Sequence, residues 1–274
     1  MKTWLITGAS SGLGFEMTCS LLARGDRVVA CARRTAPFEV LSQQYGERLR
    51  VARFDITDTA ALRHEIDAAF AAFGHIDVVV GNAGYGLFGA AEEVSDAQIE
   101  RQLATNLTGS IQLVRAVLPH LREQGGGRYV QVSSEGGQIA YPNFSLYHAS
   151  KWGIEGFLEA VSLEVAPFGI EMLIAGPGPT ATGFLEGLDR APTMAVYDAT
   201  PAGEVRRGVF DGSFRVKGDA ARTVAAIIEA VDAKSMPRRL ALGSTAFDNI
   251  EKALQERLQA LQTQKRIAYA ADRL

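Results

Sequence analysis

The sequence predicts an α/β fold: a doubly wound parallel sheet of about seven strands, with helices on both faces and a small lid. Apolar runs of strand length alternate with longer amphipathic segments along the 274-residue chain, a pattern typical of crossover connections between parallel strands. Two of these runs, at 28–32 and 78–80, are apolar without alternation. Continuous apolar character is expected of strands that are buried on both faces.

The individual elements follow from periodicity and from capping residues. Strands are expected at 3–7, 27–32, 49–54, 76–81, 127–132, 170–175 and 238–242, and helices at 12–24, 58–73, 96–121 and 145–167. Asp58 and Gly74 are suited to cap the second of these helices. Asp219 opens a further helix. One stripe of that helix carries Val224, Ile227, Ile228 and Val231.

One region, 178–217, departs from the alternation: it is rich in Gly, Pro, Thr and aromatic residues and has no clear strand. Its position after the sixth strand favours a lid over a ligand site, although a poorly ordered loop is the alternative. We therefore expect a single domain, 1–274, with a lid-like excursion at about 178–217.

Composition narrows the class of protein. The chain is 47% hydrophobic and 22% charged, and its net charge of -3 gives no reason to expect nucleic acid or an acidic membrane as a partner. An apolar stretch of membrane-spanning length is missing from the sequence, and the first strand leaves no room for a signal peptide. Cys19 and Cys31 lie in apolar segments and are expected to be buried thiols. We therefore expect a cytoplasmic protein.

The first strand leads into a glycine-rich turn, Thr7-Gly8-Ala9-Ser10-Ser11-Gly12-Leu13-Gly14, and then into a helix. Glycines permit a tight turn and a close approach of a pyrophosphate, and the helix N-terminus supplies free N–H groups. The spacing differs from G-x-G-x-x-G, and any tight strand-to-helix turn uses glycine. The turn alone is therefore a weak indication of a dinucleotide site.

Tyr147 and Lys151 stand four residues apart in one expected helix, so their side chains share a face. A free tyrosine, with a pKa of about 10, is poorly matched to proton transfer at neutral pH. A nearby ammonium is expected to favour the phenolate and so to lower that pKa. Surface helices contain such pairs by chance, so this pair is also weak when taken alone.

Together, the motifs resemble those of the short-chain dehydrogenase/reductase family. They are Thr-Gly-x-x-x-Gly-x-Gly at 7–14, Asn82-Ala83-Gly84, Asn106, Ser134, Tyr147-x-x-x-Lys151 and Pro177-Gly178, in the family's order over roughly 3–182. The segment 151–157 resembles the steroid and retinoid branch, and the ketoreductases are a similar subgroup. The resemblance implies a single-domain Rossmann fold and an oxidoreductase acting on CH–OH groups. Such an enzyme transfers a hydride between NADP(H) and a carbonyl or secondary alcohol.

The resemblance also implies catalytic roles. Tyr147 is the expected acid/base, and the family places a serine thirteen residues earlier (147 − 13 = 134). Ser134 would thus hydrogen-bond the substrate oxygen, with Ser133 as a structural neighbour. Lys151 would bind the nicotinamide ribose, and Asn106 would hold a water that links Lys151 to solvent.

Further cofactor contacts are implied along the chain. Asp55 would hydrogen-bond the adenine amino group, and Ile56 would line the adenine pocket. Thr180 occupies a position where the family has valine, so its backbone contact with the carboxamide is less certain. The remaining expected contacts are Gly8, Ser10, Ser11, Gly12, Leu13, Gly14, Asn82, Ala83, Gly84, Pro177, Gly178 and Thr182.

The end of the second strand predicts the coenzyme. A carboxylate there would bind the ribose 2′-hydroxyl of NAD and repel the 2′-phosphate of NADP, but the strand ends in Ala32 followed by Arg33 and Arg34. A guanidinium can grip a phosphate through paired hydrogen bonds, and Arg33 is the better placed by family register. NADP(H) is therefore expected, with NAD(H) as a possible second coenzyme. Two solvated arginines at a strand end are the alternative.

Aromatic residues around the catalytic segment and in the lid predict the pocket. Together with Ser134, five residues are expected to surround a hydrophobic ketone or alcohol, although ordinary lid packing explains them almost equally well: Tyr141, Phe144, Phe184, Leu185 and Tyr197. We expect His148 to be a packing or rim residue, and Trp152 and Phe157 to lie in the core. The other histidines, His64, His75 and His120, lack metal-ligand spacing, so we expect no catalytic metal.

Two other functions are compatible with parts of the sequence. A redox-sensing NADP-binding regulator would resemble this fold with a degraded tetrad, and an epimerase or dehydratase of the extended type would have a larger substrate domain. The resemblance also implies a homodimer or homotetramer. Part of the apolar set on the helices near 106–121 and 147–165 would pair with a second subunit: Ile111, Val114, Val117, Leu121, Ile154, Leu158, Val161 and Val165.

Overall fold

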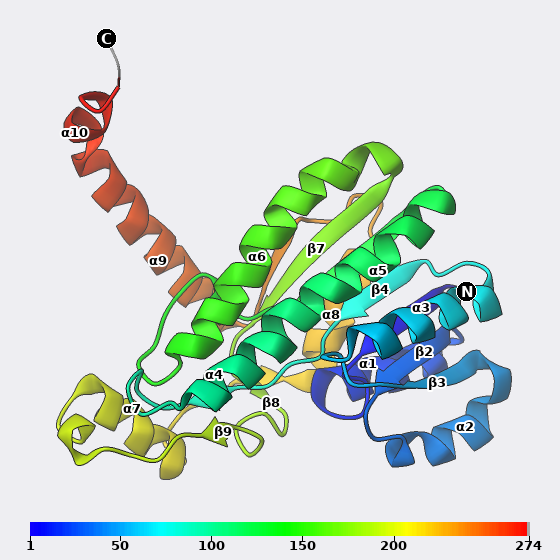
Figure 1. Ribbon diagram of the computed structural model, residues 1–274, viewed down its shortest axis with the longest axis horizontal. Coiled ribbons are helices and arrows are strands. Elements are labelled where there is room, and N and C mark those ends of the chain that lie inside the picture. Colours follow the sequence, from blue (N-terminus) through cyan, green and yellow to red (C-terminus); the bar gives the residue numbers. More distant parts are fainter. Residues whose placement is uncertain (273–274) are drawn as a thin grey trace.

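The computed structural model describes residues 1–272 and contains the predicted parallel sheet (Figure 1). Its seven strands lie in the order β11-β7-β6-β4-β1-β2-β3, and all neighbours are parallel. They are β1 Thr3–Thr7, β2 Arg27–Ala32, β3 Leu49–Arg53, β4 Val78–Gly81, β6 Gly127–Val132, β7 Ile170–Pro177 and β11 Arg239–Leu242. The expected fold is confirmed, with β4 beginning two residues later than predicted and β7 ending two residues later.

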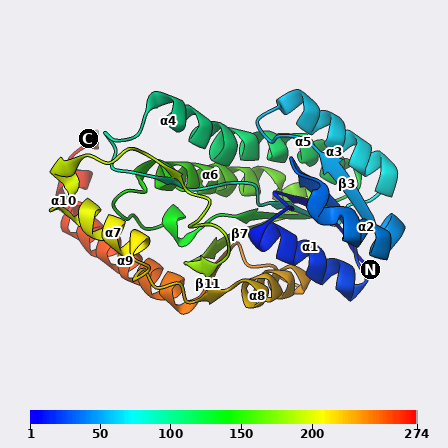
Figure 2. The same ribbon diagram turned by 90° about the horizontal axis from the view of Figure 1, so that it is seen from below.

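Helices cover both faces of the sheet, as Figure 2 shows. One face carries α1 (Gly12–Arg24) and α8 (Ala220–Asp232). They pack against the apolar side chains that the central strands present to that face, among them Trp4, Val28 and Leu173. The other carries α3 (Thr59–Phe73), α5 (Ser110–Glu123) and α6 (Ser145–Val165). Since the sheet separates two apolar clusters, the central strands are buried on both sides, which explains the continuous apolar runs of β2 and β4.

The predicted caps hold two of these helices. The Asp58 carboxylate accepts hydrogen bonds from the backbone of Ala60 and Ala61 at the start of α3, and Gly74 ends that helix with a φ of 69°. The Asp219 carboxylate likewise accepts from the backbone of Arg222. Of the stripe predicted on α8, three residues are fully buried and Ile228 is half-buried.

The helix expected at 96–121 is interrupted. It consists of α4 (Asp96–Leu103), the π-helical turn η3 (Ala104–Gly109) and α5. A π-turn inserts an extra residue into the helical repeat and is frequent at functional sites. Here it contains Asn106, so the interruption lies where the sequence placed a site residue.

The region 178–217 forms defined elements and makes up the lid. They are β8 (Thr180–Ala181), β9 (Asp189–Arg190), η6 (Ala195–Tyr197) and α7 (Pro201–Phe210); β10 (Gly218–Asp219) follows the lid, and β5 (Leu87–Phe88) belongs to the body segment after β4. Short parallel pairs join β5 to β9 and β8 to β10. The lid is therefore tied to the body rather than a structureless loop.

Several elements were not predicted from the sequence. They are η1 (Ala36–Phe38), α2 (Glu39–Tyr45), η2 (Gly46–Arg48), η4 (Glu135–Gly137), η5 (Ala166–Phe168), α9 (Ser244–Thr263) and α10 (Lys265–Tyr269). The first part of α9 packs on the body through Ala246 and Ile250. Its remainder and α10 extend away from the domain (Figure 1).

Two expectations about the core need correction. Trp152 is 44% exposed, because it faces outward on α6, where the Arg257 guanidinium lies 5.1 Å from its ring centroid. Phe157 is only half-buried, although it packs against the core. Cys31 is buried as expected, whereas Cys19 is half-buried; both are free thiols.

Within residues 1–272, no helix is long and apolar enough to cross a membrane. The same part of the chain contains no group of three or more His, Cys, Asp or Glu side chains placed to hold a metal ion.

A buried ion pair anchors the lid. The Glu93 carboxylate accepts hydrogen bonds from Arg206 of α7 (2.5 Å) and from the backbone of Met194 and Ala90 (both 2.7 Å). Arg206 also pairs with Asp198 at 3.2 Å, but that carboxylate is 65% exposed. The two acidic partners of one arginine thus differ chiefly in burial.

Glu93→Ala leaves Arg206 buried without its main partner, so we expect the free energy of unfolding to fall by about 3 kcal/mol or more. Protease cleavage within 191–217 should also become faster, as the lid opens locally. Denaturant unfolding and limited proteolysis measure both effects. The matched control, Asp198→Ala, should cost less than about 1 kcal/mol because that carboxylate is exposed. Equal effects of the two changes would show that burial of the pair does not anchor the lid.

Candidate active site

The predicted site residues converge on the carboxyl edge of the sheet. The strand order reverses between β1 and β4, since β2 and β3 continue to one side and β6, β7 and β11 to the other. At such a reversal the loops diverge and leave a crevice, which is where ligands bind in open α/β sheets.

The glycine-rich turn after β1 requires its glycines. Gly8 and Gly12 have φ values of +64° and +54°, in the left-handed region that favours glycine. A Cβ on Gly14 would lie 2.5 Å from the Gly8 carbonyl oxygen. Ser11 is the N-cap of α1, and within the described chain its side chain makes no capping hydrogen bond. The first turn of α1 therefore offers backbone N–H groups and a positive dipole end to an anion.

Asn82 and Thr7 fasten this turn to the end of β4. The Thr7 hydroxyl accepts from the backbone of Asn82 (3.0 Å) and Ala83 (3.2 Å), while the Asn82 amide donates to the carbonyls of Thr7 (3.0 Å) and Gly8 (3.2 Å). Asn82 therefore shapes the turn, and a direct contact with adenosine stays a prediction. This role of Thr7, the first residue of the motif, was not predicted from the sequence.

The ends of β2 and β3 bring Arg33 and Asp55 together. The Arg33 guanidinium is 78% exposed and lies 3.5 Å from the Asp55 carboxylate, which also accepts from the backbone and hydroxyl of Thr57. Partial burial raises the pKa of Asp55, but the Thr57 hydrogen bonds and the Arg33 charge outweigh it, so the pKa falls below its usual value. Ile56 is buried beside this pair, and Arg34 is exposed. This edge of the sheet thus presents an exposed arginine side chain next to a carboxylate.

The residues predicted to be catalytic meet where α6 packs on the end of β6. The Tyr147 and Ser134 hydroxyls lie close enough for Ser134 to lower the pKa of Tyr147, while the Ser134 oxygen accepts from the Gly136 backbone at 3.0 Å. Lys151 Nζ donates to the Val132 carbonyl at 3.0 Å and lies 5.7 Å from the Tyr147 ring centroid. The Ser133 hydroxyl instead donates to the buried Glu155 at 2.5 Å. The structure therefore places Ser134, and not Ser133, beside the tyrosine.

Burial dominates the electrostatics of this pair. It raises the pKa of Tyr147 to about 12 against the lowering effect of the Ser134 hydroxyl, and Glu135 and Glu155 raise it further. It lowers the pKa of Lys151 to about 8, with Glu155 acting in the opposite direction. The expected lowering of the Tyr147 pKa is therefore not found in the described residues 1–272, because desolvation and the two carboxylates outweigh the effect of Ser134. The phenol is protonated at neutral pH.

Asn106 is buried at the π-turn and reaches toward α6. Its amide oxygen accepts from the Tyr85 backbone (3.1 Å), and its nitrogen donates to the Tyr85 carbonyl (2.8 Å) and the Ser150 hydroxyl (3.4 Å). A Cβ on Gly84 would lie 3.2 Å from the Asn106 oxygen. Asn106 thus joins the loop after β4 to α6, and its water-holding role stays a prediction.

The loop after β7 approaches the glycine-rich turn. A Cβ built on Gly12 would lie 3.8 Å from Cβ of Thr182, so two predicted cofactor contacts from distant parts of the chain are neighbours. The Thr180 hydroxyl donates to the Gly178 carbonyl at 2.8 Å, and that of Thr182 to the Thr180 carbonyl at 3.4 Å. Pro177 ends β7 and directs this loop across the crevice.

An apolar wall stands beside Tyr147. The Phe184 ring from the lid lies 5.6 Å from the Tyr147 ring, and Phe144 lies 6.1 Å from it. The whole cluster comprises Phe88, Phe144, Leu188, Tyr141, Tyr147, Phe184, Leu185, Val205 and Val209. Four of the five predicted pocket residues belong to it, while Tyr197 lies outside it and donates to Glu92 at 2.7 Å. Tyr197 is therefore a lid residue outside this apolar cluster, and its contact with substrate stays a prediction.

The polar groups behind this wall were not predicted from the sequence. The Tyr141 hydroxyl donates to the buried Glu135 at 2.5 Å, and Asn249 of α9 donates to both. Asn249 has no local motif, since only the docking of α9 brings it here. His148 is buried as a packing residue: its Nδ1 bonds the Gly136 carbonyl and its Nε2 accepts from the Tyr141 backbone, both at 2.8 Å.

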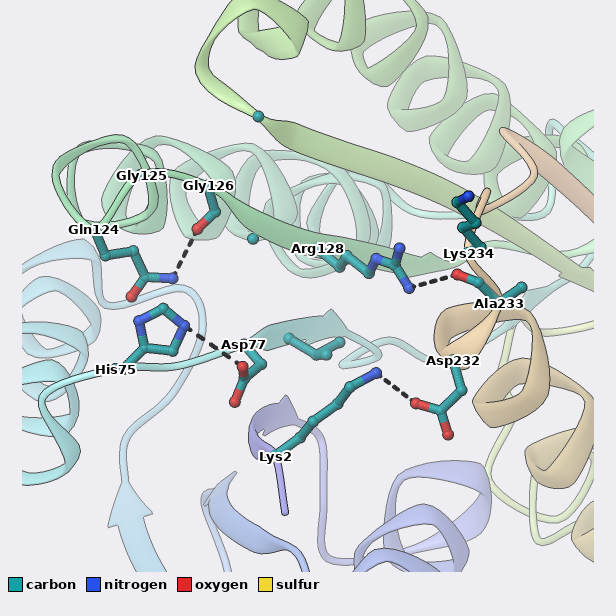
Figure 3. A pocket seen from close by; sticks show the side chains of 13 residues that line it. Lys2, His75, Asp77, Gln124, Gly125, Gly126, Arg128, Asp232, Ala233 and Lys234 are labelled. Atoms are coloured by element: carbon teal, nitrogen blue, oxygen red, sulfur yellow. Dashed lines mark hydrogen bonds and ion pairs between the residues drawn. The ribbon is translucent and has the colours of Figure 1, made fainter.

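A hollow of 470 Å³ lies at the opposite, amino edge of the sheet (Figure 3). Lys2 pairs there with Asp232, His75 with Asp77, and Arg128 with the Ala233 carbonyl. Because these charged groups bind one another, and because Tyr147 lies at the other edge, this hollow is separate from the site.

Three comparisons identify the family. The model of the short chain dehydrogenase family matches residues 2–193. Oxidoreductase BOA17 of Botryotinia fuckeliana is 34% identical over 259 residues, which cover 92% of each chain. The crystal structure of a short-chain dehydrogenase from Streptomyces avermitilis superposes with a TM-score of 0.91 at 35% identity, covering 99% of this chain and 98% of that one.

A further solved structure was determined with a nicotinamide cofactor. It is the 3-ketoacyl-(acyl-carrier-protein) reductase of Brucella melitensis complexed with NADH, with a TM-score of 0.74 at 25% identity over 88% of this chain and 95% of that one. With the family match, the shared fold and the assembled Ser134, Tyr147 and Lys151, these findings agree: the chain belongs to the short-chain dehydrogenase family and is an oxidoreductase of that family.

Proposed function

We propose that this protein transfers a hydride between NADP(H) and the carbonyl or secondary alcohol carbon of a hydrophobic small molecule, with Tyr147 as acid/base. The observation that carries the proposal is the meeting of Ser134, Tyr147 and Lys151 at one side of an apolar wall. A phenol, a hydroxyl and an amine around one point are the groups needed to handle a proton on a substrate oxygen.

The crevice fits a dinucleotide. The uncapped first turn of α1 would hold the pyrophosphate, Arg33 the 2′-phosphate and Asp55 the adenine, while Lys151 would bind the nicotinamide ribose. Gly8 and Gly14 let the turn pack tightly against Asn82 and Ala83, where a Cβ would clash, and this tight turn directs the start of α1 toward the proposed ligand. When bound, the nicotinamide supplies or accepts the hydride.

The residues of the chain handle the proton. In the direction of reduction, the Tyr147 phenol donates its proton to the carbonyl oxygen, and Ser134 donates a hydrogen bond that stabilises the negative charge developing there. The raised pKa of Tyr147 keeps this donor protonated at neutral pH. Lys151 and Asn106 would then return a proton from solvent to Tyr147.

The apolar wall supports a hydrophobic substrate. Phe184, Leu185, Val205 and Val209 come from the lid segment, and Phe88 and Phe144 from the body, so a ligand between them would lose apolar surface to both.

One assay distinguishes the proposed oxidoreductase from the two other candidate functions. A redox sensor would bind NADP without turnover, and an epimerase or dehydratase would show no net cofactor consumption. Steady, substrate-dependent oxidation of NADPH with ketones of graded size supports the oxidoreductase proposal over both.

Tyr147→Phe removes the proton donor but keeps the ring that packs on Phe184. We expect kcat to fall by at least ~10²-fold, since general acid catalysis typically contributes ~10²- to 10⁴-fold, while NADPH binding is retained. Steady-state kinetics and fluorescence titration of NADPH measure the two effects. A variant that keeps more than about a tenth of the wild-type kcat would refute the role of Tyr147.

Ser134→Ala and Ser133→Ala form a matched pair of adjacent serines. Loss of Ser134 should lower kcat by on the order of 10²-fold or more, as for other oxyanion donors. Ser133 bonds Glu155 and not Tyr147, so its loss should lower kcat less. If Ser133→Ala is the more damaging change, the assignment of the catalytic serine is wrong.

Arg33 should set the coenzyme preference. One hydrogen bond to a charged group contributes about 1.5–3 kcal/mol, so kcat/KM with NADPH should exceed that with NADH by roughly 10- to 150-fold. Ala32→Asp with Arg33→Ala should shift the preference toward NADH. Equal use of both coenzymes by the wild-type enzyme would show that Arg33 does not reach the phosphate.

We also propose a homodimer or homotetramer formed through the outer face of α6. The apolar residues predicted for this interface on the helices near 106–121 and 147–165 are buried in the chain's own core, except Ile111, which is half-buried. The contact must therefore use others, and Trp152, Leu163 and Phe168 are 44%, 68% and 47% exposed. Light scattering should show at least a dimer at micromolar concentration. Trp152→Glu with Leu163→Glu should shift it toward monomer, and a wild-type monomer would contradict the proposal.

A further inference from the structure

One face of α6 carries a third polar residue after the tyrosine and the lysine. Tyr147, Lys151 and Glu155 follow one another at intervals of four residues, so they lie in a row along the helix. The first two contact the residues on either side of Ser133, and Glu155 accepts the Ser133 hydroxyl at 2.5 Å. Three successive turns of α6 thus contact three consecutive residues at the end of β6.

The fold makes room for the Glu155 carboxylate. The residue is 2% exposed, and a Cβ on Gly137 would lie 1.8 Å from its Oε1. Its Oε2 accepts from the Arg239 guanidinium, which also donates to Glu159 at 2.7 Å. A carboxylate is expensive to bury, so its position four residues from a buried lysine calls for a reason beyond joining α6 to β11.

We propose that Glu155 is a positioning residue of the active site: its buried carboxylate keeps Lys151 in the ammonium form and holds the strand end that carries Ser134. The inference rests on the proposed function for its catalytic meaning. Burial lowers the pKa of Lys151 to about 8, and the negative charge of Glu155 opposes that fall. Without the opposing charge, more of Lys151 would be neutral at neutral pH and would bind a ribose more weakly.

The charged and titratable groups that face Lys151 and Glu155 come from three elements. Substitutions of two of these groups should shift the pKa of Lys151 in opposite directions. Removing the Glu155 charge should lower the pKa of Lys151, and removing the Arg239 charge should raise it by leaving Glu155 less compensated. The groups that face the pair are Tyr147 and Glu159 on α6, Glu135 on η4 and Arg239 on β11.

The test is an NMR titration of lysine Cε in the protein labelled with ¹³C-lysine, which has six lysines. The Lys151 signal is assigned as the one lost in Lys151→Arg. In Glu155→Gln the Lys151 midpoint should move to lower pH by about one unit or more, and in Arg239→Gln it should move to higher pH. Glu159→Gln is the matched control: it takes a carboxylate from the same arginine at an exposed place, so the midpoint should stay within about 0.3 unit.

Turnover supplies a second measurement. With a ketone that the wild-type enzyme reduces, the alkaline limb of the kcat profile should move in the same directions as the Lys151 midpoint. Glutamine can still accept the Ser133 hydroxyl, so folding is expected to survive in Glu155→Gln. Should that variant nevertheless unfold, the opposite shift in Arg239→Gln decides the question.

An unchanged Lys151 midpoint in folded Glu155→Gln, or shifts of the same sign in Glu155→Gln and Arg239→Gln, would overturn the proposal. The titration is independent of catalysis. Shifted midpoints together with a fully active Tyr147→Phe would refute the proposed function while leaving the electrostatic role of Glu155 intact.

Discussion

The site depends on the contact between one face of α6 and the last residues of β6. A strand end is held by backbone pairing on both sides, since β6 lies between β4 and β7 in the sheet. The helix is held by Ile154, Leu158 and Val161, which pack into the core on the neighbouring stripe. Two rigid elements therefore determine where Ser134, Tyr147 and Lys151 meet, and loops contribute little to their spacing.

The charged groups buried in this contact oppose folding. Lys151, Glu155 and Glu135 are all buried, and desolvation of charged groups opposes folding. Each of them is hydrogen-bonded: Lys151 to a backbone carbonyl, Glu155 to Ser133 and Arg239, and Glu135 to Tyr141 and Asn249. The apolar clusters on both faces of the sheet offset the desolvation. A site with shifted pKa values is thus built on a scaffold with a large conventional core.

The reversal of strand order forms one side of the site, and the lid forms another. The reversal opens the crevice beside the glycine-rich turn, and Thr7 and Asn82 keep the two diverging strand ends together. The lid brings Phe184 against Tyr147 and is fastened to the body by Glu93 and Arg206. The residues proposed to hold the cofactor and those proposed to contact the substrate therefore come from different parts of the fold.

The sequence by itself determined the seven parallel strands, the principal helices and which serine lies beside Tyr147, because these depend on local periodicity, capping and spacing. Tertiary structure alone decided which polar groups pair across the fold: Glu155 with Ser133 and Arg239, Asn249 with Glu135, and Arg206 with Glu93. It also turned Trp152 outward, placed Tyr197 against Glu92 and reversed the expected direction of the Tyr147 pKa. Burial and long-range pairing depend on which distant segments meet, and no spacing within one segment contains that information.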